Sequence, residues 1–428
     1  MKIGIAFLAV ISLIVHRTFG QVKASPERME ARIQSLAKFG ANPEGGVSRI
    51  AYSEADIAGR AYVMDLMKKA GLSVRIDAAG NIIGRRNGKD NTKPVIAFGS
   101  HIDSVPGGGN YDGDVGSLGA LEVIELLNEN KITTTHPLEL YIFQNEEGGL
   151  IGSSAVSGRL EEAELDLISN SGKTIRQGIK DIGGNPDELQ SAARKKGDFK
   201  AFVELHIEQG GTLERENLQI GVVEGIVAIK QWMVTLEGKA NHAGTTPMNQ
   251  REDAMLAAAK LTVAVNDVVN SIDGRQVGTV GKIRAYPGAP NVIPGKVEMT
   301  IEIRDLDFQK VLKIFDQIRS RGQQISEASG VIISYESINE DLPATSDPRI
   351  QKLIEASAKD LKLTYKYMPS GAGHDSQDIA LIAPVGMIFV PSRAGISHSP
   401  KEYTSPQDMA NGASVLYHTI LKIDKAQF

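Results

Sequence analysis

A strand, a helix and a second strand follow one another between residues 94 and 144, and this order constrains the fold more than any other feature. The run PVIAFGS (94–100) is short and apolar, as is typical of a buried parallel strand, and residues 138–144 form a second such run. Between them, four apolar side chains recur at helical spacing: Leu118, Leu121, Ile124 and Leu127. The order predicts an α/β fold in which a right-handed crossover joins parallel strands.

Ionisable side chains follow the predicted strands at the point where each strand ends. Four strand ends carry imidazole or carboxylate groups: His101 with Asp112, Glu146 with Glu147, His206, and His398. In open α/β sheets, ligands bind beyond the carboxyl ends of the strands. We therefore expect these side chains to converge at one edge of the sheet.

The mixture of imidazole and carboxylate groups indicates a metal site. Without sulfur ligands, such a set suits Zn, Mn, Co or Ni, and one bridging carboxylate can hold two ions about 3.5–4 Å apart. The chain contains no cysteine, which excludes disulfides, thiolate ligands and a cysteine nucleophile. The alternative is that each histidine is a structural residue at a strand end and that Glu146 and Glu147 are only a solvated pair.

Residues 223–340 carry a different order of elements. Strand and helix patterns follow there as β-α-β-β-α-β, the order of a ferredoxin-like unit. This unit interrupts the first sheet, which residues 341–428 complete. We therefore predict a mixed sheet flanked by helices, with an inserted α+β domain at 223–340 between a first part (21–222) and a second part (341–428) of the main domain.

The first 20 residues have the pattern of a secretory signal peptide. Lys2 precedes a brief apolar run, and small residues follow at TFG before Gln21. The apolar run is short for a membrane span, which needs about 20 residues. We expect cleavage near Gly20 and a secreted or periplasmic location; the alternative is an uncleaved anchor. A net charge of −5 and the lack of a basic run argue against nucleic-acid binding.

Nine motifs resemble those of the M20 metallopeptidase superfamily and occur in the same order. They are GSHIDSV, NYDGDVG, NEEGG, ELHIEQG, KANHAGTTPM, NVIPG, EIRD, GAGHDS and GISHSP. The resemblance covers nearly the whole chain after the leader. It is strongest to the amidohydrolase branch, which includes N-carbamoyl-L-amino acid hydrolases, β-ureidopropionases and allantoate or ureidoglycolate amidohydrolases. The fold that this implies is a metal-dependent catalytic domain with an inserted lid that also dimerises.

The resemblance implies a role for each residue of the predicted metal site. Two metal ions would share Asp112: one ion held also by His101 and His206, the other also by Glu147 and His398. Glu146 would be the general base, and the carboxylate of Asp103 would accept the second ring N–H of His101. Peptidase members tend to carry a carboxylate at the position of His206, so the histidine favours ureido substrates.

The resemblance also implies a set of substrate-binding residues. These are Gln209, His242, Asn291, Arg304, Gly373 and His374. His242 would be an oxyanion donor, Arg304 would clamp a substrate carboxylate, and Gln209 would bind the ureido group. In dimeric relatives the lid histidine and asparagine reach the neighbouring subunit's site, which implies a homodimer here.

Several of these assignments have structural alternatives. Arg304 could form only a surface ion pair with Asp305 or Asp307, and His242 could be a turn residue. In GAGHDS, backbone contacts from Gly371 and Gly373 compete with the ring of His374. A separate departure from the family pattern is Asp114, an extra carboxylate that either alters metal preference or points to solvent.

The expected activity is hydrolysis of the carbamoyl C–N bond of N-carbamoyl-L-amino acids or related ureido acids, which releases ammonia and carbon dioxide. The alternatives are allantoate or ureidoglycolate hydrolysis, then a dipeptidase or aminoacylase, and last a ligand-binding homologue without turnover. A phosphate-binding loop is not supported, because Leu167 stands where NSGKT (170–174) would need its first glycine. The chain has no G-x-S-x-G motif, which argues against a serine esterase.

Overall fold

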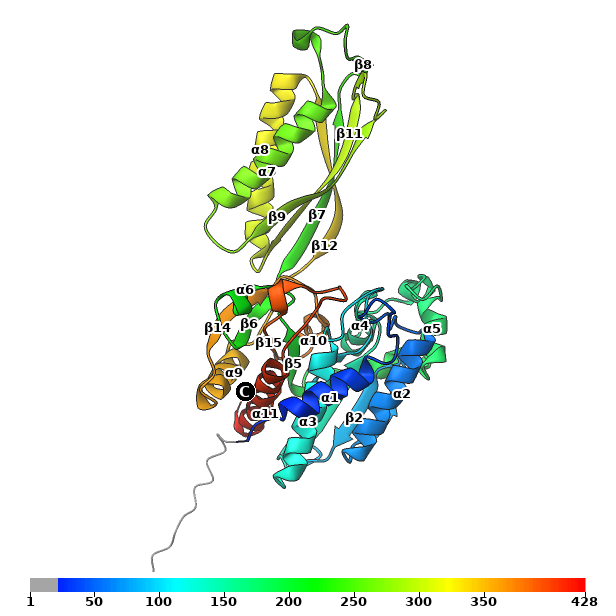
Figure 1. The fold of residues 1–428 in the computed structure, drawn as a ribbon, viewed down its shortest axis with the longest axis vertical. Coiled ribbons are helices and arrows are strands. Elements are labelled where there is room, and N and C mark those ends of the chain that lie inside the picture. The colour runs from blue at the N-terminus through cyan, green and yellow to red at the C-terminus, as the bar shows by residue number, and fades with distance from the viewer. Residues whose placement is uncertain (1–21, 428) are drawn as a thin grey trace, which may run out of the picture.

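The computed structural model describes residues 22–427, so the predicted signal segment at 1–20 lies outside the described residues. Figure 1 shows two units joined end to end: a sheet flanked by helices, and a smaller unit that extends from one end of it. Within residues 22–427, no helix combines the length and the apolar character needed to cross a membrane.

The larger unit is built on a mixed sheet of nine strands. Its strand order is β1-β2-β4-β3-β5-β15-β6-β13, and β14 pairs with β6. The strands are β1 Ser73–Ile76, β2 Ile82–Arg86, β3 Val95–His101, β4 Leu138–Phe143, β5 Phe199–Ile207, β6 Ile220–Ile226, β13 Ala344–Thr345, β14 Tyr365–Ser370 and β15 Val385–Val390. At its centre β4, β3, β5 and β15 run parallel, whereas β1, β2, β6 and β13 introduce antiparallel pairs.

Helices cover both faces of this sheet, which explains why its central strands β3, β4 and β15 are buried along their whole length. One face packs against α1 Pro26–Leu36, α2 Glu54–Lys69, α3 Asp114–Glu129, α9 Pro348–Asp360 and α11 Pro406–Lys425. The other face packs against α4 Ile151–Ser157 and α10 Asp375–Ile379. The short helices α5 Ile175–Asp181 and α6 Thr212–Arg215 lie in connections beside the sheet.

The smaller unit has the β-α-β-β-α-β order expected from the sequence. Its elements are β7 Ala228–Glu237, α7 Ala254–Ser271, β9 Val277–Tyr286, β11 Lys296–Asp305, α8 Phe308–Ser329 and β12 Ile332–Asp341. The strand order β12-β7-β11-β9 is antiparallel throughout, and both helices pack on one face, where the rings of Trp232 and Phe315 stack. A two-stranded pair, β8 Asn241–His242 with β10 Val292–Ile293, lies at the end remote from the main sheet (Figure 1).

The chain crosses between the two units twice. It enters the smaller unit after Ile226 and returns to the main sheet through residues 342–343. The mixed sheet with an inserted α+β unit agrees with the predicted fold class. Because β3, β4, β5 and β15 run parallel, their carboxyl ends lie at one edge of the main sheet.

Candidate metal centre

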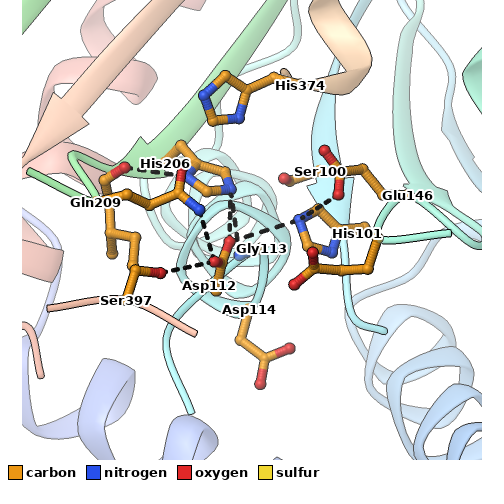
Figure 2. Close-up of polar contacts among 12 residues, drawn as sticks. Ser100, His101, Asp112, Gly113, Asp114, Glu146, His206, Gln209, His374 and Ser397 are labelled. Atoms are coloured by element: carbon orange, nitrogen blue, oxygen red, sulfur yellow. Dashed lines mark hydrogen bonds and ion pairs between the residues drawn. The ribbon is translucent and has the colours of Figure 1, made fainter. Parts of the chain in front are cut away.

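Four elements of the main sheet bring the predicted ligands together. His101 is the last residue of β3, His206 is the penultimate residue of the longer strand β5, and Asp112 precedes α3. Glu147 follows β4, and His398 lies in the loop after β15. Figure 2 shows the imidazoles of His101 and His206 on either side of the Asp112 carboxylate.

The first cluster consists of His101, Asp112 and His206, which each offer one ligand atom within 4.8 Å of the others. Nε2 of His206 lies 3.1 Å from Oδ1 of Asp112, and Nε2 of His101 lies 3.8 Å from that oxygen. All three residues are buried. Gly113 makes this approach possible, because a Cβ atom there would lie 2.4 Å from the ring of His101.

The second cluster consists of Asp112, Glu147 and His398. Nε2 of His398 lies 3.3 Å from Oδ2 of Asp112 and 3.5 Å from Oε2 of Glu147. Asp112 therefore presents one oxygen to each cluster, which is the arrangement of a bridging carboxylate. Among the described residues, it is the one shared by these two clusters.

The donor set of both clusters fits divalent metal ions. Nε2 of His101 and Oε1 of Glu147 are buried and have no hydrogen-bond partner, as expected of atoms whose partner is an ion. Burial lowers the pKa of His101 to about 4, so its ring is neutral and can donate a lone pair. Burial alone would raise the pKa of Asp112, but hydrogen bonds from His206 and His398 hold it well below its usual range.

A third group of potential ligands, Glu204, His206 and His374, lies next to the first cluster. Its groups already have partners: the Glu204 carboxylate accepts from the hydroxyls of Ser100 and Ser376 at 2.8 and 2.7 Å, and Nε2 of His374 contacts the hydroxyl of Ser370 at 2.8 Å. The ring of His374 packs against His206, with centroids 4.4 Å apart. We interpret this group as support for His206.

Glu146 and Glu147 are presented by a tight turn at the end of β4. Asn145 adopts a φ of 52°, which is uncommon for a residue other than glycine. The carboxylate of Asp103 accepts the backbone N–H groups of Glu146 and Glu147, each at 3.2 Å. Glu147 thereby joins the second cluster, while Oε2 of Glu146 lies 3.7 Å from Nε2 of His101.

This geometry corrects the expected role of Asp103. Nδ1 of His101 lies 3.0 Å from the backbone carbonyl oxygen of Asp103 but 3.8 Å from its carboxylate. The carbonyl therefore accepts the second ring N–H, because the two glutamate N–H groups occupy the carboxylate. Asp103 therefore orients His101 through its carbonyl and the glutamate turn through its carboxylate; only the contact with the glutamate turn was not expected from the sequence.

Two other site residues share the left-handed backbone of Asn145. Gln209 has a φ of 56° and His398 a φ of 52°. Non-glycine residues in this region cost roughly 1–3 kcal/mol each and concentrate at functional sites. Nε2 of Gln209 donates to Oδ2 of Asp112 at 2.7 Å, so its side chain directly contacts a predicted metal ligand (Figure 2).

Arg304 extends from the end of β11 back toward the main sheet. Its Nη1 donates to the carbonyl oxygen of Gly371 at 2.7 Å, and its Nε pairs with Glu302 at 2.7 Å. The structural alternative, an ion pair of Arg304 with Asp305 or Asp307, is therefore wrong, because the acidic partner of Arg304 is Glu302. The contact places the guanidinium on the loop that also carries Gly373 and His374.

His242 and Asn291 lie far from the metal ligands of their own chain. They belong to the exposed tip of the smaller unit around β8 (Figure 1). Nδ1 of His242 accepts the N–H groups of Gly244 and Thr245 at 3.0 and 3.2 Å, and the carbonyl of Asn291 accepts the N–H of Ala243 at 2.9 Å. In this conformation neither residue contacts the predicted metal ligands of its own chain.

Asp114 neither points to solvent nor joins either metal cluster. Its side chain is buried and forms an ion pair with Arg49, which is buried as well. Arg49 also donates to the carbonyl oxygens of Ile102 and Leu36, at 2.6 and 3.0 Å. The pair ties the segment around Arg49 to the start of α3, so Asp114 is structural.

We expect Asp114→Ala to destabilise the protein by about 3–5 kcal/mol, since it leaves Arg49 as an uncompensated buried charge. Urea and thermal denaturation measure the loss, and Asp114→Asn is expected to lose less because it retains an acceptor for Arg49. The order of metal preference should stay unchanged. A variant with normal stability and a new metal preference would show that Asp114 acts on the metal ions instead.

The sequence matches the model of peptidase family M20/M25/M40 over residues 97–422. The chain belongs to this family. The N-carbamoyl-L-amino acid amidohydrolase of Geobacillus stearothermophilus is 39% identical over 406 residues, which cover 94% of this chain and 99% of that protein. The ureidoglycolate hydrolase of Oryza sativa subsp. japonica is 42% identical over 401 residues, 91% of this chain and 82% of that protein.

A solved structure extends the similarity to the whole M20 fold. A hydantoinase/carbamoylase family amidase from Burkholderia multivorans aligns with a TM-score of 0.90 at 34% identity, covering 95% of this chain and all of that one. The resemblance seen in the nine motifs is thereby confirmed. Sequence reasoning missed Glu204, Glu402 and Ser397. Each of them forms a hydrogen bond with a residue that is distant along the chain: Glu204 with Ser100, and Glu402 and Ser397 with Asp112.

Proposed function

We propose that this M20 chain is a dinuclear metal-dependent amidohydrolase. It cleaves the ureido C–N bond of N-carbamoyl-L-amino acids or related ureido acids and so acts on carbon–nitrogen bonds other than peptide bonds. The observation that carries the proposal is the adjacent pair Glu146 and Glu147: one belongs to a ligand cluster, and the other faces the same centre without joining it. Metal-assisted hydrolysis uses a general base that lies next to the metal ligands.

The ligand set proposed for the two ions is His101, Asp112 and His206 for one, and Asp112, Glu147 and His398 for the other. Zn, Mn, Co and Ni all suit these donors. When bound, such ions supply Lewis-acid polarisation of the ureido carbonyl and lower the pKa of water.

Glu146 would move the proton during the reaction. Burial, followed by the charges of Asp375 and Glu147, raises the pKa of Glu146 well above its usual range, which makes its carboxylate a stronger base. It takes a proton from the attacking water, and the oxygen of that water bonds to the carbamoyl carbon. Glu146 then returns the proton to the leaving nitrogen as its bond to the carbamoyl carbon breaks, which releases ammonia and a carbamic acid. The carbamic acid loses carbon dioxide to give the amine, so that one ureido group and one water give an amine, ammonia and carbon dioxide.

The substrate would lie between Gln209 and Arg304. The amide of Gln209 is next to the metal ligands and suits the ureido group, while the Arg304 guanidinium suits a carboxylate. A cavity of about 500 Å³ opens beside Gln209 and Gly371, which gives room for a side chain or for a second ureido group. Gly373 and His374 are the remaining substrate-binding residues of the proposal; they follow Gly371 on the same loop but do not line this cavity.

The proposal includes a homodimer in which each lid completes the other subunit's site. His242 and Asn291 lie at the exposed tip of the smaller unit, where a partner's metal centre could receive them. There, His242 would donate to the oxyanion and Asn291 would supply an amide. A good oxyanion donor contributes about 3–4 kcal/mol.

Mixing two inactive variants tests this exchange. We expect His242→Ala and Glu146→Gln chains, unfolded and refolded together, to regain about a quarter of the wild-type activity, because half of the dimers are mixed and each holds one intact site. Ammonia release before and after mixing measures the gain. Recovery far below this level, with dimers present, would place His242 in its own subunit's site or outside catalysis.

Ammonia release by the metal-loaded chain tests the function itself. N-carbamoyl amino acids, allantoate and ureidoglycolate form one panel; dipeptides and N-acetyl amino acids, scored by free amine, form the other. We expect ammonia from a ureido compound and loss of that activity on chelation. Free amine from peptides alone would assign the chain to the peptidases. No product from any compound of either panel, with two metal ions bound, would favour ligand binding without turnover.

Export is a separate part of the proposal and rests on the sequence of residues 1–20. We propose that the signal is cleaved and that the enzyme acts in the periplasm or outside the cell. N-terminal sequencing of the exported chain should begin near Gln21. A chain that keeps Met1 in the membrane fraction would indicate the uncleaved anchor.

A further inference from the structure

We propose that Ser397 and Glu402 control the access of a metal ion to Oδ2 of Asp112, with Glu402 as a positioning residue for the ion held by His398. Neither residue belongs to a ligand cluster. The inference rests on the proposed metal centre, to which it adds two residues, and it concerns how tightly that centre holds its second ion.

Oδ2 of Asp112 has two hydrogen-bond donors within reach. Nε2 of Gln209 donates to this oxygen at 2.7 Å, and the hydroxyl of Ser397 lies 2.9 Å from it (Figure 2). A carboxylate oxygen offers about two lone-pair sites. When Ser397 donates its proton to this oxygen, both sites are used by hydrogen-bond donors, although His398 lies 3.3 Å from the same oxygen. A cation between His398 and Asp112 has to displace one donor.

Ser397 is the donor that can leave without losing a hydrogen bond. Its hydroxyl lies 2.8 Å from Oε2 of Glu402 as well as 2.9 Å from Oδ2 of Asp112. A hydroxyl has one proton, so it donates to one of these carboxylates at a time. When Ser397 turns its proton to Glu402, a lone pair on Asp112 becomes free for a cation.

Glu402 is held in the position that this exchange requires. Its Oε1 accepts the backbone N–H groups of Tyr111 and Asp112, at 2.9 and 3.0 Å, and the residue is only 4% exposed. Gly109 leaves space for the carboxylate, since a Cβ atom there would lie 2.1 Å from Oε1. Oε1 is thus fixed to the loop of the bridging residue, and Oε2 remains for Ser397.

The substitution Glu402→Gln separates these two functions of the carboxylate. The amide oxygen can still accept both backbone N–H groups, but the amide NH₂ then faces Ser397 and cannot accept its proton. Flipping the amide would set NH₂ against two buried N–H donors, which is costly. The proton of Ser397 stays on Asp112, so we expect the weaker of the two ions to bind about tenfold less tightly.

Metal titration against a fluorescent chelator measures this loss without using turnover. The double variant Glu402→Gln with Ser397→Ala removes the proton in question, and its affinity should return to that of Ser397→Ala alone. If Glu402 only supports the loop, the double variant stays as weak as Glu402→Gln. Glu336→Gln, an exposed position on β12, is the matched control.

Two outcomes overturn the inference alone: wild-type affinity in Glu402→Gln, or no recovery in the double variant, each with normal melting temperature. A wild-type chain that binds no divalent ion overturns the proposed metal centre and this inference together. The two failures are thus distinguishable in one titration series.

Discussion

The Glu146→Gln variant is expected to bind two metal ions per chain and still to lose turnover by about 100- to 10,000-fold, the usual contribution of a general base. The amide has nearly the shape of the carboxylate but cannot take a proton from water. Because Glu146 belongs to neither ligand cluster, its replacement leaves the ligands of both ions in place.

The metal-free form of this variant should not lose stability. Burial and the nearby charges of Asp375 and Glu147 make the ionised carboxylate of Glu146 unfavourable, so a neutral amide removes a cost. Metal content, melting temperature and kcat measured on one preparation separate the possibilities. Near-wild-type kcat with both ions bound would exclude Glu146 as the base, and loss of an ion would make it a ligand.

The Asp112→Ala variant is expected to lose both ions, since Asp112 gives Oδ1 to one cluster and Oδ2 to the other. Each lost Lewis acid removes several kcal/mol of transition-state stabilisation, so activity should fall on the order of 1000-fold or more. Metal content after dialysis measures the change.

Two histidine variants serve as controls for Asp112→Ala. His398→Ala should lose one ion, because His398 belongs to the second cluster alone. His136→Ala should lose none. His136 and Pro94 precede β4 and β3, at the ends of these strands remote from the metal centre, and Nδ1 of His136 contacts the carbonyl oxygen of Pro94 at 2.8 Å. Two ions retained by Asp112→Ala would contradict the bridging role.

The sequence was most informative where function depends on the ends of regular elements. The apolar runs at β3 and β4 predicted a buried parallel pair, and the structure pairs Ile96–His101 with Leu138–Phe143. The residues that follow these strands meet at one edge for the same geometric reason. The β-α-β-β-α-β order of the insertion was likewise predicted from periodicity, a pattern that involves only residues close together in the sequence.

Contacts between distant segments could not be predicted in the same way. Glu402 and Asp112 are 290 residues apart, and Arg49 and Asp114 are 65 apart, with no pattern that links them. Asp103 is a second example. The sequence places it near His101, but whether its carbonyl or its carboxylate accepts the ring N–H depends on the turn at Asn145. Such hydrogen-bond partners are determined by tertiary packing and not by the local sequence.

The central claim is that Asp112 joins two cation sites into one reaction centre. Anomalous diffraction at the metal edge, from crystals of the Zn- or Mn-loaded protein, tests it most directly. We predict two peaks about 3.5–4 Å apart, one between His101 and His206 and one between Glu147 and His398, with Asp112 touching both. A single peak, or a peak among Glu204, His206 and His374 with neither predicted position filled, would contradict the account.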